Sequence, residues 1–336
     1  MGKPIPDLDL SIAAITKETA CYLVSLDLSG TYEIQAADCE IIGRSSAGIT
    51  RPLIVTVNGK RGFLKDSSLY DEGDDLEFLI NAIGRYLDIP MAEEYRVLNR
   101  NMEKDSFLSM DVASGAGDTF YEMSAVRQMT ADRVLKNNEI LQPWMIDWGE
   151  VIQHPAFPDI EGAFEYLCES ESAYDIAINF PVYLLEYYFG KNKEALELFR
   201  KRYFEMLMFD IFVGQVDRTM ENYGIITDQT WKEYSMAPLF DCATLAKPYL
   251  PDNIYVINEL AADRETLFRI LATRYHRYII PMADKINQRI PMVFPKITEL
   301  AGVWIENENS ERLIANIRHY FEMAKKYLGE EYDKTM

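Results

Sequence analysis

The sequence predicts an α+β fold in two lobes, in which a small antiparallel β lobe with one main helix precedes a mostly helical lobe. The first observation is a series of short β-like runs, separated by turn residues, that ends near residue 112. The second is the three- and four-residue apolar spacing that dominates after residue 119. The sequence SGAGD at 114–118 separates the two patterns. We therefore divide the chain into an N-terminal extension packed on the small lobe (1–36), the small lobe (37–113) and the helical lobe (114–336).

The composition limits the classes of function. A chain of 336 residues with 48% hydrophobic content can bury a sizeable core. No apolar run approaches the roughly 18 residues that span a membrane, and the start lacks a signal-peptide core, so we expect a cytoplasmic protein and no membrane. The four cysteines lack the paired spacing of zinc or disulfide frameworks. A net charge of −20 argues against nucleic-acid binding by this chain on its own.

The small lobe is predicted from its β runs and one helix. Runs at 39–42, 53–57 and 62–65 come first, and Asn58-Gly59 is a strong hairpin turn between the last two. A helix is expected after Asp74 or Asp75, because apolar residues then recur at helical spacing. Further runs at 94–98 and 106–112 complete this lobe.

The loop GRSSAGITRP, residues 43–52, lies between the first two runs. Its glycines and small hydroxyl residues suit a backbone whose N–H groups approach phosphates closely. An ordinary surface turn has the same composition, and that alternative stays open. The candidate phosphate contacts in this loop are Gly43, Ser45, Ser46 and Gly48.

The helical lobe is predicted from apolar periodicity after residue 119. The segments with this spacing are 161–168, 181–188, 193–213, 264–287 and 310–328.

The stretch 208–247 carries the acidic residues of interest. An apolar run ends shortly before Asp217, Asn222 follows five positions later, and Asp241 comes 24 residues after Asp217. Two β-like runs, 223–227 and 231–236, flank a turn at 228–230. A hairpin there would carry Asp241 back beside Asn222.

This layout is typical of phosphoryl transfer. A kinase needs one Asp to accept or orient the hydroxyl proton, an Asn five residues on to hold magnesium, and a later Asp to bridge metal and phosphates. Magnesium prefers such hard oxygen ligands and takes only one or two carboxylates from the protein. Asp and Asn also mark ordinary turns, but the combination with an apolar helix and a hairpin favours the catalytic interpretation.

The segments DIFVGQVDRTMENYG and MAPLFDCAT resemble the catalytic and metal-binding segments of the HipA-like kinases. The sequence Ser45-Ser46-Ala47-Gly48 is similar to a Ser-x-Ala-Gly element of that family. Gln215 stands where many other kinases have His, and Thr219 where phosphoinositide kinases have His. The resemblance covers roughly residues 40 to 250 and implies a two-lobed protein-kinase-like fold that uses ATP and Mg²⁺.

The resemblance also implies a role for each candidate residue. Asp217 would be the base or hydroxyl-orienting residue, and Asn222 and Asp241 the metal ligands. Lys65 would contact the phosphates of ATP and form an ion pair with Glu77, which lies in the first turn of the predicted helix. Without the resemblance, a snorkelling strand-end Lys and a helix-start Glu explain these two residues equally well. Met110 and Val112 would belong to the hinge that contacts adenine.

The function implied by the resemblance is a serine/threonine protein kinase that also phosphorylates itself, with Ser45 as the serine that switches it off. A protein substrate is then expected, and the family also admits an antitoxin-like partner. One alternative is a small-molecule phosphotransferase with its acceptor among the C-terminal helices. Another is a non-catalytic binding module with the same fold. It is favoured by Thr219 and Ala243, two positions at which the sequence departs from the usual kinase patterns.

Overall fold

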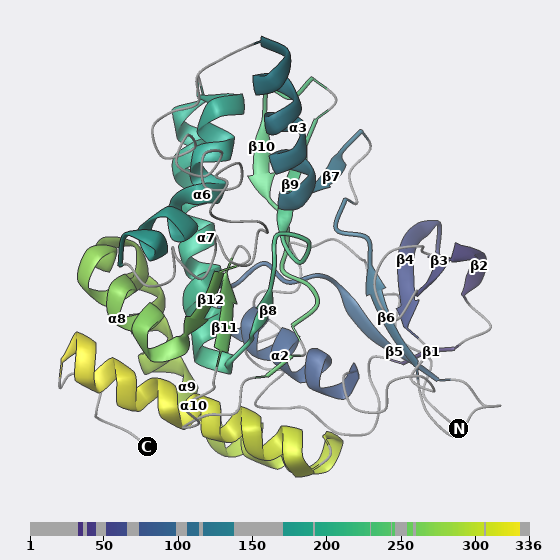
Figure 1. Ribbon diagram of the computed structural model, residues 1–336. Helices are drawn as coiled ribbons and strands as arrows, with labels where there is room; N and C mark the ends of the chain where they lie inside the picture. Colours follow the sequence, from purple (N-terminus) through teal and green to yellow (C-terminus); the bar gives the residue numbers. More distant parts are fainter. Residues whose placement is uncertain are drawn as a thin grey trace, which may run out of the picture.

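The computed structural model describes residues 33–35, 39–44, 52–65, 74–98, 106–113, 117–137, 171–190, 192–228, 230–242, 244–245, 254–257, 260–305 and 307–329. Strands β1 to β6 lie together on one side of the molecule, and helices α6 to α10 gather on the other (Figure 1). Within the described ranges, no helix combines the length and the apolar character that a membrane crossing requires.

The small lobe contains a six-stranded sheet in the order β1-β5-β6-β4-β3-β2, antiparallel except that β1 runs parallel to β5. Its strands are β1 (Glu33–Gln35), β2 (Glu40–Arg44), β3 (Leu53–Val57), β4 (Lys60–Lys65), β5 (Glu94–Leu98) and β6 (Ser106–Met110). The predicted hairpin joins β3 and β4, with positive φ at Asn58 (51°) and Gly59 (76°) as its tight turn requires. This part of the prediction is confirmed. Residues 33–35, expected in the N-terminal extension, belong to the sheet.

Helix α2 (Asp74–Tyr86) is the predicted helix of this lobe, and its apolar positions are buried. These side chains join the main hydrophobic core with helices of the other lobe, whereas the sheet has a separate small core around Val55, Tyr95 and Leu108. Arg289 of α9 (His276–Trp304) adds an ion pair with Asp88 at 2.8 Å and a hydrogen bond to the Tyr86 carbonyl at 2.8 Å. Helix α2 is therefore fixed to the helical lobe.

The helical lobe contains α3 (Met123–Asn137), α6 (Glu171–Phe189), α7 (Lys193–Val213), α8 (Arg264–Arg274), α9 and α10 (Asn307–Leu328). The predicted bounds of α7 are confirmed. A single helix over 264–287 is wrong, because the chain bends at Tyr275, where φ is −118° and ψ is 20°. The Tyr275 side chain packs on Phe204 and its hydroxyl donates to Asp175 at 2.9 Å, so tertiary contacts hold the bend. The expected helix 161–168 lies outside the described residues.

The helical lobe also contains short strands, only some of which the sequence predicted. The sheet β10-β9-β7 contains β7 (Thr119–Glu122), β9 (Gly224–Thr227) and β10 (Tyr234–Met236), and the sheet β12-β11-β8 contains β8 (Asp217–Arg218), β11 (Ile254–Ile257) and β12 (Leu260–Asp263). The hairpin expected after Asn222 is confirmed as β9–β10. Strands β7, β8, β11 and β12 were not predicted.

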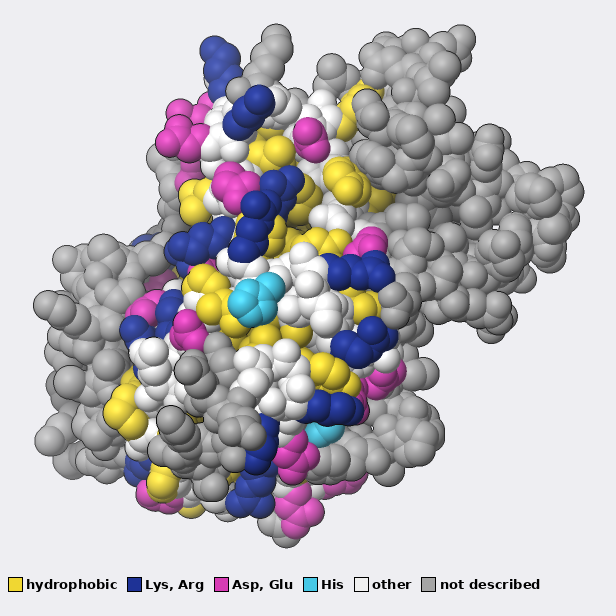
Figure 2. Space-filling model, turned by 90° about the vertical axis from the view of Figure 1, so that its left-hand side faces the viewer, with side chains coloured by type: hydrophobic (Ala, Val, Ile, Leu, Met, Phe, Trp, Pro, Cys, Tyr) yellow, Lys and Arg dark blue, Asp and Glu magenta, His cyan; other side chains and the backbone are white. Residues whose placement is uncertain are grey.

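Charge is distributed unevenly over the surface. Figure 2 shows Lys and Arg side chains gathering on the face where α8 lies, although the whole chain has a net charge of −20. The segment 265–296 in α8 and α9 is itself mostly basic: Arg269, Arg274, Arg277, Lys285, Arg289 and Lys296 stand against Glu265 and Asp284. The net charge therefore does not describe every face of the molecule.

Candidate active site

Helix α7 ends directly before the loop of the candidate site. Its last turns, from Tyr203 to Val213, are buried throughout. Gly214 ends the helix with φ 83° and donates its N–H to the Asp210 carbonyl at 2.8 Å. A Cβ at Gly214 would fall far inside contact distance of the Asn316 amide, so both conformation and space require glycine here.

The loop from Asp217 to Asn222 is held by its own hydrogen bonds. The Asn222 Nδ2 donates to the Asp217 carbonyl at 2.6 Å, and the Asn222 N–H donates to the Thr219 carbonyl at 3.0 Å. Partial burial and the nearby charge of Asp241 raise the pKa of the Asp217 carboxyl above its ordinary value. A carboxyl with a raised pKa is better suited to accept a proton near neutral pH.

The hairpin β9–β10 carries the chain back toward this loop. The segment after β10 runs beside the link that follows α2: the Leu239 N–H donates to the Pro90 carbonyl at 2.8 Å, and the Ala92 N–H donates to the Leu239 carbonyl at 2.7 Å. Asp241 comes next, with a left-handed backbone (φ 54°). This pairing joins the helical lobe to α2 and the small sheet.

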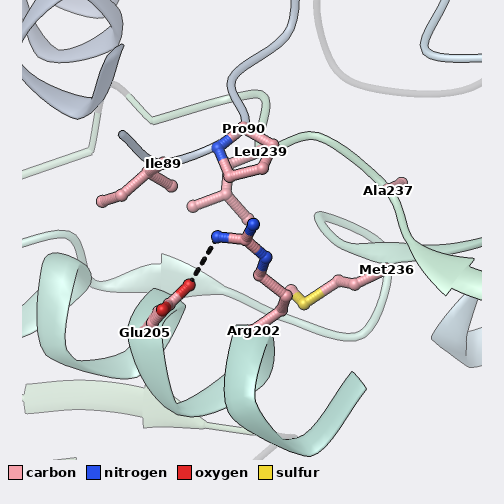
Figure 3. Close-up of a pocket in the computed structure, with 7 residues that line it drawn as sticks. All are labelled: Ile89, Pro90, Arg202, Glu205, Met236, Ala237 and Leu239. Atoms are coloured by element: carbon pink, nitrogen blue, oxygen red, sulfur yellow. Dashed lines mark hydrogen bonds and ion pairs between the residues drawn. The ribbon is translucent and has the colours of Figure 1, made fainter. Parts of the chain in front are cut away.

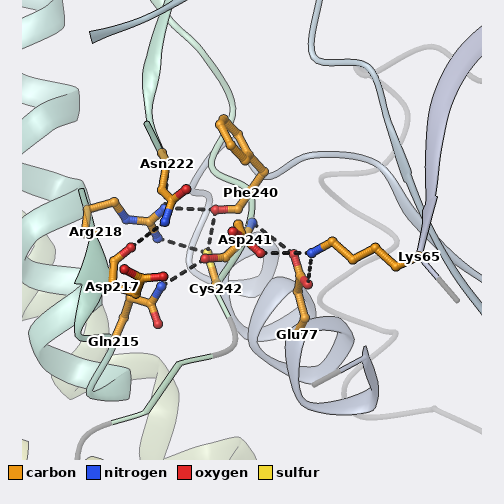
Figure 4. Close-up of polar contacts among 9 residues, drawn as sticks. All are labelled: Lys65, Glu77, Gln215, Asp217, Arg218, Asn222, Phe240, Asp241 and Cys242. Atoms are coloured by element: carbon orange, nitrogen blue, oxygen red, sulfur yellow. Dashed lines mark hydrogen bonds and ion pairs between the residues drawn. The ribbon is translucent and has the colours of Figure 1, made fainter. Parts of the chain in front are cut away.

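Three polar groups of Asp241 each bond to a different residue (Figure 4). Its N–H donates to Glu77 Oε1 at 2.9 Å, its carbonyl accepts from Gln215 Nε2 at 2.9 Å, and its Oδ1 accepts from Lys65 Nζ at 2.9 Å. Gln215, where many other kinases have His, thus holds the Asp241 backbone. These bonds stabilise a conformation that non-glycine residues seldom adopt.

Lys65 bridges two carboxylates at the end of β4. Its Nζ lies 2.8 Å from Glu77 Oε2 and 2.9 Å from Asp241 Oδ1. Burial alone would lower the pKa of the Lys65 ammonium, but the two carboxylates outweigh burial and raise it. Burial also raises the pKa of the Glu77 carboxyl, and Lys65 partly offsets that effect. The predicted ion pair between Lys65 and Glu77 is therefore present, and the ammonium stays charged at neutral pH.

Arg218 is a residue of the site that the sequence analysis left without a role. Its guanidinium forms two 3.0 Å bonds with the Asp210 carboxylate and is 1% exposed. The signal was present in the sequence, since an Asp inside an apolar helix and an Arg directly after Asp217 are both unusual in buried segments.

Glu94 is a second missed residue. It is 3% exposed on β5, and its Oε2 has no hydrogen-bond partner among the described residues. Burial and the charge of Glu77 raise the pKa of the Glu94 carboxyl well above its ordinary value. Among its described residues the small lobe therefore contains two buried carboxyls, Glu77 and Glu94, and of these two Glu77 has the ion pair with Lys65.

Three of the remaining predicted ligand contacts lie in or beside the small sheet. Gly43 is in β2, Met110 ends β6 with its side chain in the small core, and Val112 follows half-buried in the link beyond the sheet. Ser45, Ser46 and Gly48 lie outside the described residues. The adenine and phosphate contacts of these six positions stay predictions.

The two candidate metal ligands, Asn222 and Asp241, fit magnesium better than a metal whose whole coordination shell comes from protein side chains. Across the described ranges, no three His, Cys, Asp or Glu side chains gather closely enough to hold a metal ion. Magnesium takes one or two carboxylates and keeps several waters, so an Asn222 amide oxygen and an Asp241 carboxylate suffice for it.

A separate small pocket lies between α7, β10 and the link after α2 (Figure 3). Arg202 and Glu205 form an ion pair at 2.7 Å along its wall. Its volume of about 20 Å³ is room for one water molecule, so it is not a nucleotide site.

Comparison with known proteins identifies the fold. No protein-family model matches the sequence, and no curated protein matches it. The solved structure of the Helicobacter pylori proinflammatory kinase CtkA matches with a TM-score of 0.55 and 13% identity, over 90% of this chain and 100% of that chain. HipA of the Shewanella oneidensis MR-1 toxin–antitoxin system, in complex with HipB and operator DNA, matches with a TM-score of 0.45 and 13% identity, over 94% of this chain and 73% of that chain. The likeness to CtkA confirms the predicted kinase-like fold, and the resemblance to HipA-like kinases holds at that level.

Proposed function

We propose that this protein is an ATP- and Mg²⁺-dependent phosphotransferase, and that it phosphorylates Ser or Thr hydroxyls of a protein. The observation that carries the proposal is the position of Lys65, which contacts both Glu77 and Asp241 although 176 residues separate Lys65 from Asp241. A chain that served only as a binding module would have no need of this arrangement beside Asp217 and Asn222. The CtkA-like fold supports the proposal, because that protein is a kinase.

Each residue would perform one task. The charged Lys65 would contact phosphate oxygens of ATP, and Glu77 would hold the Lys65 side chain in place. Asn222 and Asp241 would hold Mg²⁺, which supplies neutralisation of phosphate charge when bound. Asp217 would orient the acceptor hydroxyl and accept its proton, a task that its raised pKa favours.

Fewer observations bear on the phosphate acceptor and on the partners of the protein. A protein substrate, self-phosphorylation, an antitoxin-like partner and a cytoplasmic location remain predictions from the sequence. A small-molecule acceptor would use the same Lys65, Asn222 and Asp241 groups, so only product analysis separates these two cases.

The test is incubation of the purified protein with labelled ATP and MgCl₂, followed by analysis of protein and small-molecule label. We expect label on protein in the parent and a loss of about 10²–10⁴-fold in Asp217→Asn, since base and orientation effects commonly supply that factor. MgATP should still raise the melting temperature of this variant, because the metal ligands remain. A parent that neither binds MgATP nor transfers label would overturn the proposal, whereas binding without transfer would favour the non-catalytic alternative.

A further inference from the structure

Three segments of the candidate active site meet at the guanidinium of Arg218. Figure 4 shows its contacts with Asn222, Phe240 and Cys242. From α7, the Asp210 carboxylate accepts two bonds, from Arg218 Nε and Nη2, each at 3.0 Å. Within its own loop, Arg218 Nη1 donates to the Asn222 carbonyl at 2.8 Å. From the segment around Asp241, the Phe240 carbonyl accepts from Nη1 at 2.8 Å and Cys242 Sγ accepts from Nη2 at 3.0 Å.

The acceptors of Arg218 lie next to the proposed metal ligands. Asn222 is itself one proposed ligand, and Phe240 and Cys242 are the immediate chain neighbours of Asp241, the other. One planar group thus contacts the backbone before Asp241, the side chain of the residue after it, and the backbone of Asn222. Arg218 therefore links the loop that contains Asn222 to the segment that contains Asp241, in addition to the bond from Gln215 Nε2 to the Asp241 carbonyl.

Charge and burial favour a positioning role over a purely stabilising one. The side chain of Arg218 is 1% exposed and that of Asp210 is 0% exposed. The guanidinium and the carboxylate are opposite charges joined by two hydrogen bonds, which is the favourable arrangement for a buried pair. Buried ion pairs often stabilise a fold no better than apolar residues would, whereas their fixed geometry can define one arrangement.

We propose that Arg218, held by Asp210, is a positioning residue that sets the relative placement of Asn222 and Asp241 for Mg²⁺ binding. This inference rests on the proposed function for its metal, but the contacts themselves can be tested without nucleotide. Lys cannot replace Arg here, because one ammonium cannot form two parallel bonds to Asp210 and also reach the carbonyls of two other segments.

The principal variant is Arg218→Lys, and Arg264→Lys is its matched control. Arg264 is equally buried, at 1% exposed, and its guanidinium bonds to the side chain and carbonyl of Asn316 in α10. Both variants remove a buried guanidinium from the helical lobe and should lower the melting temperature. Only Arg218→Lys should loosen the two loops. Asp210→Asn, which retains shape and loses the charge, is the second variant if Arg218→Lys does not fold.

The first measurement is amide hydrogen exchange without ligand, in peptides covering 215–224 and 237–242. We expect exchange on the order of tenfold faster in Arg218→Lys than in the parent, with no such change in Arg264→Lys. Equal exchange in all three proteins would overturn the positioning role, whether or not the protein is a kinase.

The second measurement is the Mg²⁺ concentration that gives half of the thermal shift at fixed ATP. Groups that orient metal ligands typically change metal affinity by about 10–100-fold, so this concentration should rise by that factor in Arg218→Lys. Binding of ATP without metal should stay unchanged, whereas a general structural defect would weaken it. An unchanged Mg²⁺ requirement in Arg218→Lys, together with a parent that does respond to Mg²⁺, would overturn the inference but leave the proposed function intact. A parent without any MgATP response would overturn the proposed function, and the exchange measurement would then decide the contact role alone.

Discussion

At the scale of single residues, Asp241 is constrained both by its backbone conformation and by its hydrogen bonds. Its left-handed backbone is tolerated better by Asp and Asn than by most residues, and Glu77 and Gln215 hold its N–H and carbonyl. The sequence indicated Asp241 by its spacing from Asp217 and Asn222. It could not indicate the contact with Gln215, because no local pattern shows which carbonyl a buried amide side chain will reach.

Asp241→Asn should weaken the response to Mg²⁺ without disturbing the backbone. Asn adopts positive φ nearly as readily as Asp, but it removes the charge that Lys65 and a hard cation both need. We expect the Mg²⁺-dependent thermal shift with ATP to be largely lost in Asp241→Asn. Asp228→Asn, in the turn of the β9–β10 hairpin, is the control and should respond as the parent does. An undiminished shift in Asp241→Asn would exclude this residue as a metal ligand.

Glu94→Gln should change how stability depends on pH. The pKa of Glu94 is raised well above its ordinary value of 4.5 in the folded protein, chiefly by burial. A raised folded-state pKa contributes stability that is present below the unfolded pKa and is lost as the pH rises through the folded pKa. Gln cannot ionise, so the variant should match the parent below about pH 4 and exceed it increasingly toward neutral pH, by about 1.4 kcal/mol for each pH unit in which only the unfolded state ionises.

Urea unfolding at several pH values measures this difference. Glu233→Gln, an exposed position after the hairpin turn, provides the control for adding an amide. A stability difference between Glu94→Gln and the parent that does not change with pH would show that Glu94 is ionised in the folded protein.

At the scale of elements, the sequence predicted best where a pattern was long or a turn was strong. The bounds of α7 followed from 21 residues of continuous helical spacing, and the β3–β4 hairpin followed from Asn58-Gly59. The bend at Tyr275 was missed because its cause is a packing contact with Phe204 from another helix. Strands β7, β11 and β12 have four residues each, too few to distinguish alternation from chance.

Gly214→Ala tests how strictly the end of α7 is fixed. A left-handed Ala costs about 1–2 kcal/mol, and its Cβ would also displace the Asn316 amide. We expect the free energy of unfolding to fall by at least that amount. Gly302→Ala in α9 is the matched control, because nothing lies within 4 Å of its Cβ and Ala should gain roughly 0.5–1 kcal/mol in a helix. If both variants were equally stable, Gly214 would be free to adopt another conformation.

At the scale of the whole molecule, the site exists only where the two lobes meet. Asp217, Asn222 and Asp241 could be predicted together, because one hairpin brings them close. The contact of Lys65 with Asp241 could not be derived from any local pattern, since it depends on how the small sheet packs beside the helical lobe. Helix α2 makes that possible, because its apolar face joins the main core while Glu77 at its start faces Lys65.

Lys65→Met tests whether the ammonium of Lys65 stabilises the contact between the two lobes. The substitution leaves Glu77, whose side chain is 3% exposed, without its ion-pair partner and close to the Asp241 carboxylate. Removing one partner of a buried pair commonly costs roughly 3–5 kcal/mol, and the half-exposed Asp241 should keep the loss toward the lower end. Combining Lys65→Met with Glu77→Gln should recover part of that stability, because no buried charge is then left unpaired. Lys232→Met, at an exposed turn position, should leave the urea midpoint near that of the parent. A double variant no more stable than Lys65→Met alone would mean that Lys65 stabilises the protein by some means other than its pair with Glu77.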